Sequence, residues 1–92
     1  MKIREAIIGR AISAIGGRNS KAYTDYEICE WVIADIEMTL EREFGVCHIA
    51  EIPNAECAKA INWEVHAMNV IEEYELPLCL AKRITYINLG GI

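Results

Sequence analysis

The fold is decided by residues 25–44, DYEICEWVIADIEMTLEREF. Thr24, just before this stretch, and Glu27, within it, form a capping-box pattern. In this pattern the side chain of each residue can accept a hydrogen bond from the unpaired backbone N–H of the other. Asp25 adds negative charge at the positive end of the helix, and Gly45 ends it. The apolar residues recur at helical spacing and form one inward stripe: Cys29, Val32, Ile33, Ile36, Leu40 and Phe44. The stretch therefore predicts a long amphipathic helix.

Two segments on either side of it also show helical periodicity. Residues 3–15 carry apolar side chains on one face, and Gly16-Gly17 ends the pattern. Residues 55–74 are apolar around most of the circumference, and Asn54 can cap them. The polar positions of this second segment form one narrow stripe: Lys59, Asn62, His66, Asn69 and Glu73. We expect this segment to be the central helix, with residues such as Ile61 and Met68 in the core.

The last segment, residues 78–89, fits two structures. Pro77 suits a first helical turn and Gly90-Gly91 suits a helix end, whereas residues 84–87 are rich in strand formers. We favour a helix; the alternative is a short two-stranded element from residues 46–51 and 84–89. The predicted fold is mainly α, a compact bundle of about four helices near 3–15, 25–44, 55–74 and 78–89, forming a single helical domain over residues 1–92.

Composition predicts a protein that associates. Of 92 residues, 53% are apolar and the mean hydropathy is +0.16, more apolar material than a lone chain of this size easily buries. We expect a homo-oligomer, with a dimer favoured. No apolar run is long enough to span a membrane and no signal peptide is visible, so a cytoplasmic location is expected. Cys29, Cys47, Cys57 and Cys79 form no C-x-x-C pair, and we expect them to be reduced and mostly buried.

Charge is unevenly distributed along the chain. Residues 1–21 contain five basic and one acidic residue, whereas residues 22–75 contain thirteen acidic and two basic ones. With a pI near 4.9, the chain does not resemble a nucleic-acid-binding protein driven by global charge. A helix-turn-helix reader would need basic or amide side chains on an exposed helix face, where residues 25–44 instead carry glutamates. No direct nucleic-acid binding is expected.

No catalytic residue and no cofactor are predicted. Neither serine, Ser13 or Ser20, lies in a nucleophile elbow. A catalytic pair of Cys47 and His66 is left as an alternative. Zinc would need three or four converging ligands, and the spacing of the cysteines and histidines between residues 47 and 66 matches no zinc motif, so no metal is predicted.

The polar side of residues 25–44 is unusual. Four glutamates fall on one ridge, and none has a basic residue four positions further on: Glu27, Glu30, Glu37 and Glu41. Trp31 and Met38 lie beside this ridge, one heptad apart. The glutamates alone could be a solvated face, and the two apolar residues could pack under the C-terminal segment. The other interpretation is a binding surface with an apolar anchor rimmed by acids.

Two functions remain open on the sequence. The first is a non-enzymatic protein–protein interaction module, whose partner is a protein with a basic surface. An inhibitor from a phage or mobile element that engages the nucleic-acid-binding surface of a larger machine is an example of this class. The alternative is a small helical homo-oligomer that binds a small anionic ligand through a basic N-terminal region: Arg4, Arg10, Arg18 and Lys21.

Overall fold

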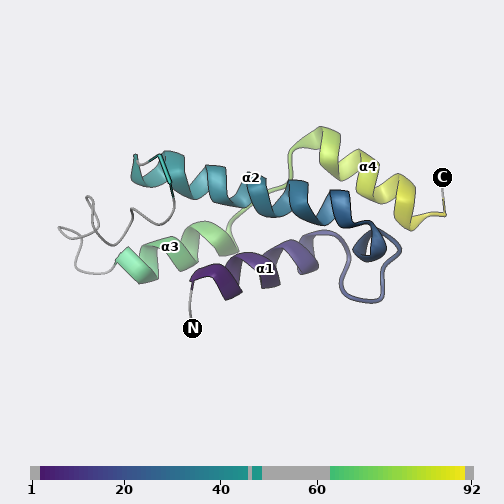
Figure 1. The fold of residues 1–92 in the computed structure, drawn as a ribbon, viewed down its shortest axis with the longest axis horizontal. Coiled ribbons are helices and arrows are strands. Elements are labelled where there is room, and N and C mark those ends of the chain that lie inside the picture. The colour runs from purple at the N-terminus through teal and green to yellow at the C-terminus, as the bar shows by residue number, and fades with distance from the viewer. Residues whose placement is uncertain (1–2, 46, 49–62, 91–92) are drawn as a thin grey trace.

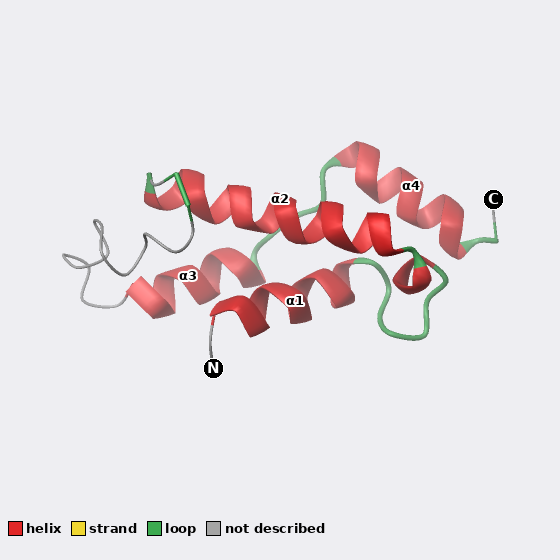
Figure 2. Cartoon of the chain, in the orientation of Figure 1, coloured by secondary structure: helices red, strands yellow, loops and turns green. Residues whose placement is uncertain are grey.

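The computed structural model describes residues 3–45, 47–48 and 63–90. Its elements are the helix α1 (Ile3–Ala14), the 3₁₀ turn η1 (Ala22–Thr24), and the helices α2 (Tyr26–Phe44), α3 (Trp63–Glu72) and α4 (Leu78–Asn88). The predicted mainly helical bundle of four helices is confirmed, and Figure 2 shows no strand in the described part of the chain. The strand alternative for residues 84–89 is wrong, because Ile84 to Asn88 continue α4. Most of residues 46–51 and all of 55–62 lie outside the described residues.

The central helix is α2, which contacts α1, α3, α4 and η1. Figure 1 shows α1 and α3 lying side by side along it, with α4 beside its N-terminal half. Four side chains at successive four-residue intervals are completely buried along this helix: Ile28, Val32, Ile36 and Leu40. The sequence prediction that the third helix is central is wrong for its described part. That helix buries Ala67 and Ile71 but exposes Val65, so its broad apolar surface is not matched by broad burial.

The N-terminus of α2 is capped by Asp25, whose carboxylate accepts hydrogen bonds from the backbone N–H groups of Glu27 and Ile28. The predicted capping box is therefore wrong. The hydroxyl of Thr24 instead donates to the carbonyl of Lys21 within η1, because Thr24 belongs to that preceding turn. An extended backbone at Asp25 separates the two helical elements and gives the aspartate the cap position.

The helix α4 is tied to the rest of the molecule by Asn88. Its side-chain amide donates to the carbonyl of Ile15 and accepts from the N–H of Ala22, at 2.9 and 2.8 Å. Gly16, at φ +110°, lies so close that a Cβ there would stand 2.9 Å from the Asn88 nitrogen. The predicted helix end at Gly16 is thus also the place where the C-terminal helix docks.

The cap can be tested by comparing two neighbouring substitutions. Asp25→Ala removes the acceptor for two otherwise unpaired N–H groups and should lower the free energy of unfolding by about 1 kcal/mol. Thr24→Ala removes only a bond within η1 and should cost clearly less. Chemical denaturation of both variants measures the difference. A larger loss for Thr24→Ala would support the capping box instead.

The burial of α2 predicts a second contrast on that helix. Leu40→Ala should lower the free energy of unfolding by about 2–5 kcal/mol, because Leu40 is fully buried. Met38→Ala, two residues away and 54% exposed, should change it by less than about half a kcal/mol. Equal losses in denaturant titrations would contradict the orientation of α2.

Candidate functional site

The candidate site is the outward face of α2, opposite its buried ridge. We call it the acidic face and define it by six residues: Glu27, Glu30, Trp31, Glu37, Met38 and Glu41. Glu27 and Glu30 are exposed, Glu37 and Glu41 are partly buried, and Met38 is 54% exposed. The structure therefore brings all six predicted residues to one side of one helix.

Its glutamates have few basic neighbours. Glu27 lies 3.9 Å from the guanidinium of Arg83 on α4, an exposed pair that contributes little stability. No ion pair within the described residues involves Glu30, Glu37 or Glu41. Tyr26, one turn before Glu30, has its pKa raised by a hydrogen bond with that carboxylate and by its charge. Most of the negative charge on this face is therefore uncompensated.

Trp31 is both packed and accessible. The guanidinium carbon of Arg83 lies 4.6 Å from the centre of the indole ring, which is a cation–π contact. The side chain nevertheless remains 39% exposed. One side of Trp31 is thus covered by the C-terminal helix, as one of the two interpretations expected, and the rest lies in solvent beside Met38.

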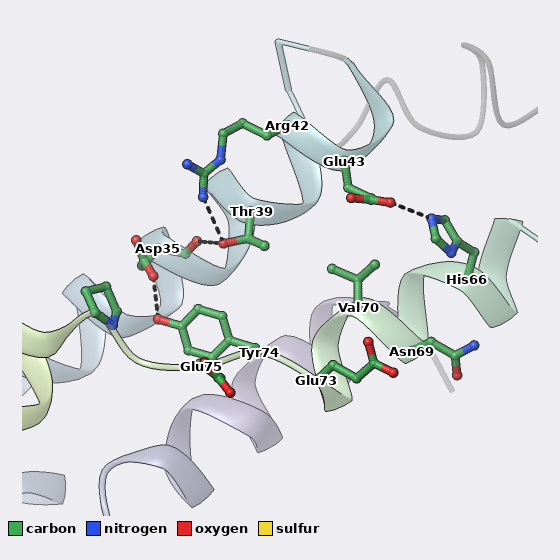
Figure 3. Close-up of a pocket in the computed structure, with 11 residues that line it drawn as sticks. Asp35, Thr39, Arg42, Glu43, His66, Asn69, Val70, Glu73, Tyr74 and Glu75 are labelled. Carbon is green, nitrogen blue, oxygen red and sulfur yellow. Dashed lines mark hydrogen bonds and ion pairs between the residues drawn. The ribbon is translucent and has the colours of Figure 1, made fainter.

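A polar groove adjoins the acidic face, between α2 and α3. It encloses about 750 Å³, and Figure 3 shows its two walls. The two walls are joined by a 3.0 Å hydrogen bond, in which Glu43 on α2 accepts from Nε2 of His66 on α3 when that nitrogen carries the proton. The other carboxylates that line it are Asp35, Glu73 and Glu75, against the single guanidinium of Arg42.

Sequence reasoning missed this groove. It joins residues 35–43 to residues 66–77, and no local pattern relates the two segments. The available signal was the polar stripe on the third helix, of which His66, Asn69 and Glu73 are exposed as predicted. By helical projection Asp35 and Arg42 follow Trp31 and Met38 around α2. The two apolar side chains therefore lie between two acidic zones, the ridge of glutamates and the groove.

Tyr74 lines the groove and is hydrogen-bonded to both α2 and α1. Its hydroxyl donates to the carboxylate of Asp35 on α2, and its carbonyl accepts a 2.7 Å bond from the guanidinium of Arg10 on α1. Burial, followed by the hydrogen bond to Asp35 and the charge of that carboxylate, raises the pKa of the Tyr74 phenol. One residue thereby joins α1 and α2 at the end of α3.

The four basic residues predicted to bind an anion lie in different surroundings. Arg10 is bonded to Tyr74, Arg18 donates to the hydroxyl of Tyr23 at 3.1 Å, and the ammonium of Lys21 lies against Gly90. Arg4 is exposed near the start of α1. The structure does not show these four cations converging on one anion site.

The prediction that the cysteines are mostly buried is wrong for those that the structure describes. Cys47 and Cys79 are exposed, and Cys29 is partly buried. Burial, with the nearby charge of Asp25, raises the pKa of the Cys29 thiol. Within the described residues no three or more His, Cys, Asp or Glu side chains are grouped as a metal site would require. Cys57 lies outside the described residues, so the prediction that the chain binds no zinc is not tested.

The described part of the chain is thus an all-helical bundle domain with an acidic outward face and an acidic groove beside it. Residues 1–84 match the ORF6C domain, and the chain belongs to that family. No curated protein and no solved structure matches the chain. No helix in the described ranges has the length and apolar character to cross a bilayer.

The raised pKa of Tyr74 predicts a specific loss of stability in alkali. The unfolded phenol ionises near pH 10 but the folded one above it, so the stabilisation is complete below pH 10 and is lost as the pH rises further. Denaturant titrations of the wild type should therefore show the free energy of unfolding falling above pH 10. Tyr74→Phe, which has no phenol to ionise, should show a smaller fall. An identical fall in both proteins would contradict the assignment.

Proposed function

We propose that this chain is a non-enzymatic protein–protein interaction module that binds a basic protein surface through the acidic face of α2. The observation that supports it most is the placement of Trp31 and Met38, both accessible, between the glutamate ridge and the acidic groove. Aromatic residues and methionine are enriched in the cores of interfaces, whereas charged residues form the rim. This surface has that arrangement.

Charge complementarity indicates the kind of partner. Glu30, Glu37 and Glu41 carry negative charge that no described cation neutralises, so a lysine- or arginine-rich surface would be attracted and oriented by them. The nucleic-acid-binding surface of a larger machine has this chemistry, and the proposed role is to occupy and inhibit it. Membership of the ORF6C family is consistent with a phage or mobile-element protein.

Three further features belong to the same proposal. Action in the cytoplasm agrees with the free thiols of Cys29 and Cys79. Self-association as a dimer agrees with the exposed apolar side chains. Anion binding by the N-terminal cations has less support, since Arg10 and Arg18 already bond to Tyr74 and Tyr23.

Charge reversal separates the acidic face from the other acidic surfaces. The variant Glu30→Lys/Glu37→Lys should retain the fold, because Glu30 is exposed and Glu37 is only partly buried. The control Glu5→Lys/Glu72→Lys changes the net charge equally, at exposed positions of α1 and α3. Tagged wild type and both variants are used to capture proteins from a lysate of the producing cell, with quantification by mass spectrometry. We expect a basic protein to be retained by wild type and control but lost by the charge-reversed variant.

Binding kinetics with that captured protein then test each part of the surface. Glu30→Lys/Glu37→Lys should slow association and weaken its salt dependence, because rim charges act mainly through steering. Trp31→Ala should raise the dissociation rate, by an amount on the order of 2 kcal/mol for an interface anchor. Unchanged capture and kinetics for the charge-reversed variant would exclude the acidic face. If Trp31→Ala mainly lowered the melting temperature, Trp31 would act only in packing beneath Arg83.

A further inference from the structure

The helix α4 is apolar on its inner side and has an exposed leucine at each end of its outer side. Its inner side packs on the core through Ile84, which is buried, and through Leu80 and Ile87. On the outer side Leu78 is 70% exposed, and Leu89, which directly follows the helix, is 82% exposed. Large exposed apolar side chains that line one surface are typical of a contact site. Within the described residues only the inner side of α4 is covered.

The outer side has the spacing of a coiled-coil seam. Leu78, Lys82, Thr85 and Leu89 are separated by four, three and four residues, so by helical projection they lie within about 60° of one another. Together with Ala81 and Tyr86 they line a shallow groove. We define this surface, Leu78, Lys82, Thr85 and Leu89, as the α4 seam.

The α4 seam is complementary to itself when two copies run antiparallel. With a two-fold axis between residues 83 and 84, Leu78 of one copy lies opposite Leu89 of the other, and Lys82 lies opposite Thr85. Both leucines are then covered at each end of the contact. In the middle, each lysine ammonium can donate to a threonine hydroxyl. No other antiparallel register pairs all four positions of the seam with one another.

We propose that two copies of this chain associate through the α4 seam as an antiparallel, two-fold symmetric pair. This gives a surface to the dimer proposed above and does not depend on what the acidic face binds. A polar residue at a core position of a coiled coil fixes the register of the helices at a cost in stability. In this pair Lys82 is that residue. Helices of eleven residues, about 16 Å long, bury a small interface, so the pair should form in the micromolar range.

The seam also agrees with the charge of α4. The helix carries Lys82 and Arg83 and no acidic residue, in a chain with a net charge of −5. Two copies of an acidic protein can therefore approach there without carboxylates facing each other, whereas the two Lys82 groups beside the two-fold axis repel each other and weaken the pair. Lys82 keeps its charge in water while its methylene stem lies on the seam.

The test uses two double variants at the same exposed positions, with oligomeric state measured by sedimentation over a range of micromolar concentrations. In Leu78→Glu/Leu89→Glu every end contact would join two carboxylates. We expect the dissociation constant to rise by about a hundredfold or more, because four leucines lose their cover. In Leu78→Lys/Leu89→Glu each lysine would face a glutamate of the other copy, so this variant should dimerise more tightly than the first. Val65→Glu, on the exposed side of α3, is the control and should leave the dimer unchanged.

Several results would overturn the inference. A wild-type monomer at all concentrations would exclude the dimer, and a dimer unaffected by Leu78→Glu/Leu89→Glu would place the interface elsewhere. Equal weakening in both double variants would exclude the antiparallel register. Dissociation by Glu30→Lys/Glu37→Lys would show instead that α4 docks head-to-tail on the acidic face of another copy. Circular dichroism of each variant checks that the helices remain folded.

Discussion

The structure depends on the four-residue spacing of Ile28, Val32, Ile36 and Leu40 along α2. This ridge is completely buried, and α1, α3 and α4 all pack against the helix that carries it. Because one face of α2 is buried in the core at every turn, the opposite face is exposed to solvent. The acidic face is therefore a direct consequence of the core. The same helical register that buries the ridge presents Glu27, Glu30 and Met38 to solvent, so neither surface can rotate without displacing the other.

Two polar side chains fix how the remaining helices sit on that ridge. Tyr74 connects the end of α3 to Asp35 of α2 and to Arg10 of α1, and Asn88 connects the end of α4 to Ile15 and Ala22. Apolar packing alone tolerates sliding and repacking, whereas hydrogen bonds to specific carbonyl and carboxylate groups do not. Burial raises the pKa of Tyr74 for the same reason that it makes this contact specific: the phenol is held neutral beside a carboxylate. The groove beside the acidic face takes its shape from this contact.

The sequence predicted those features that local periodicity determines. The first three helices follow from it, as do the helix ends at Gly16 and Gly45 and the outward position of the glutamate ridge. The fourth helix was favoured only by its flanking residues, Pro77 and Gly90-Gly91, because its own residues fit a helix or a strand. The errors occurred where two local patterns competed or where only tertiary contacts decide. Thr24 and Asp25 can both cap a helix. In the structure Thr24 bonds within η1, so Asp25 caps α2. Apolar composition favoured the third helix as the centre, although burial depends on how many neighbours a helix meets. The groove could not be predicted, because it joins segments far apart in the chain. For Trp31, packing under the C-terminal segment was one of two interpretations, but nothing in the sequence identified Arg83 as the residue over its ring.

The exposed leucines and the acidic charge of this chain lie on different helices. The charge is concentrated on the outward face of α2 and in the groove, whereas the most exposed leucines lie at the two ends of α4, at Leu78 and at Leu89, which directly follows the helix. An apolar surface suits contact with an identical copy, which carries the same net charge, and an acidic surface suits a basic partner. A two-fold pair through α4 would hold the two acidic faces at a fixed separation. Two weak contacts to a repetitive basic surface would then act together, because the second forms at high effective concentration once the first has formed. The dimer and the acidic face would in this way contribute to a single binding event, although each can be removed without the other.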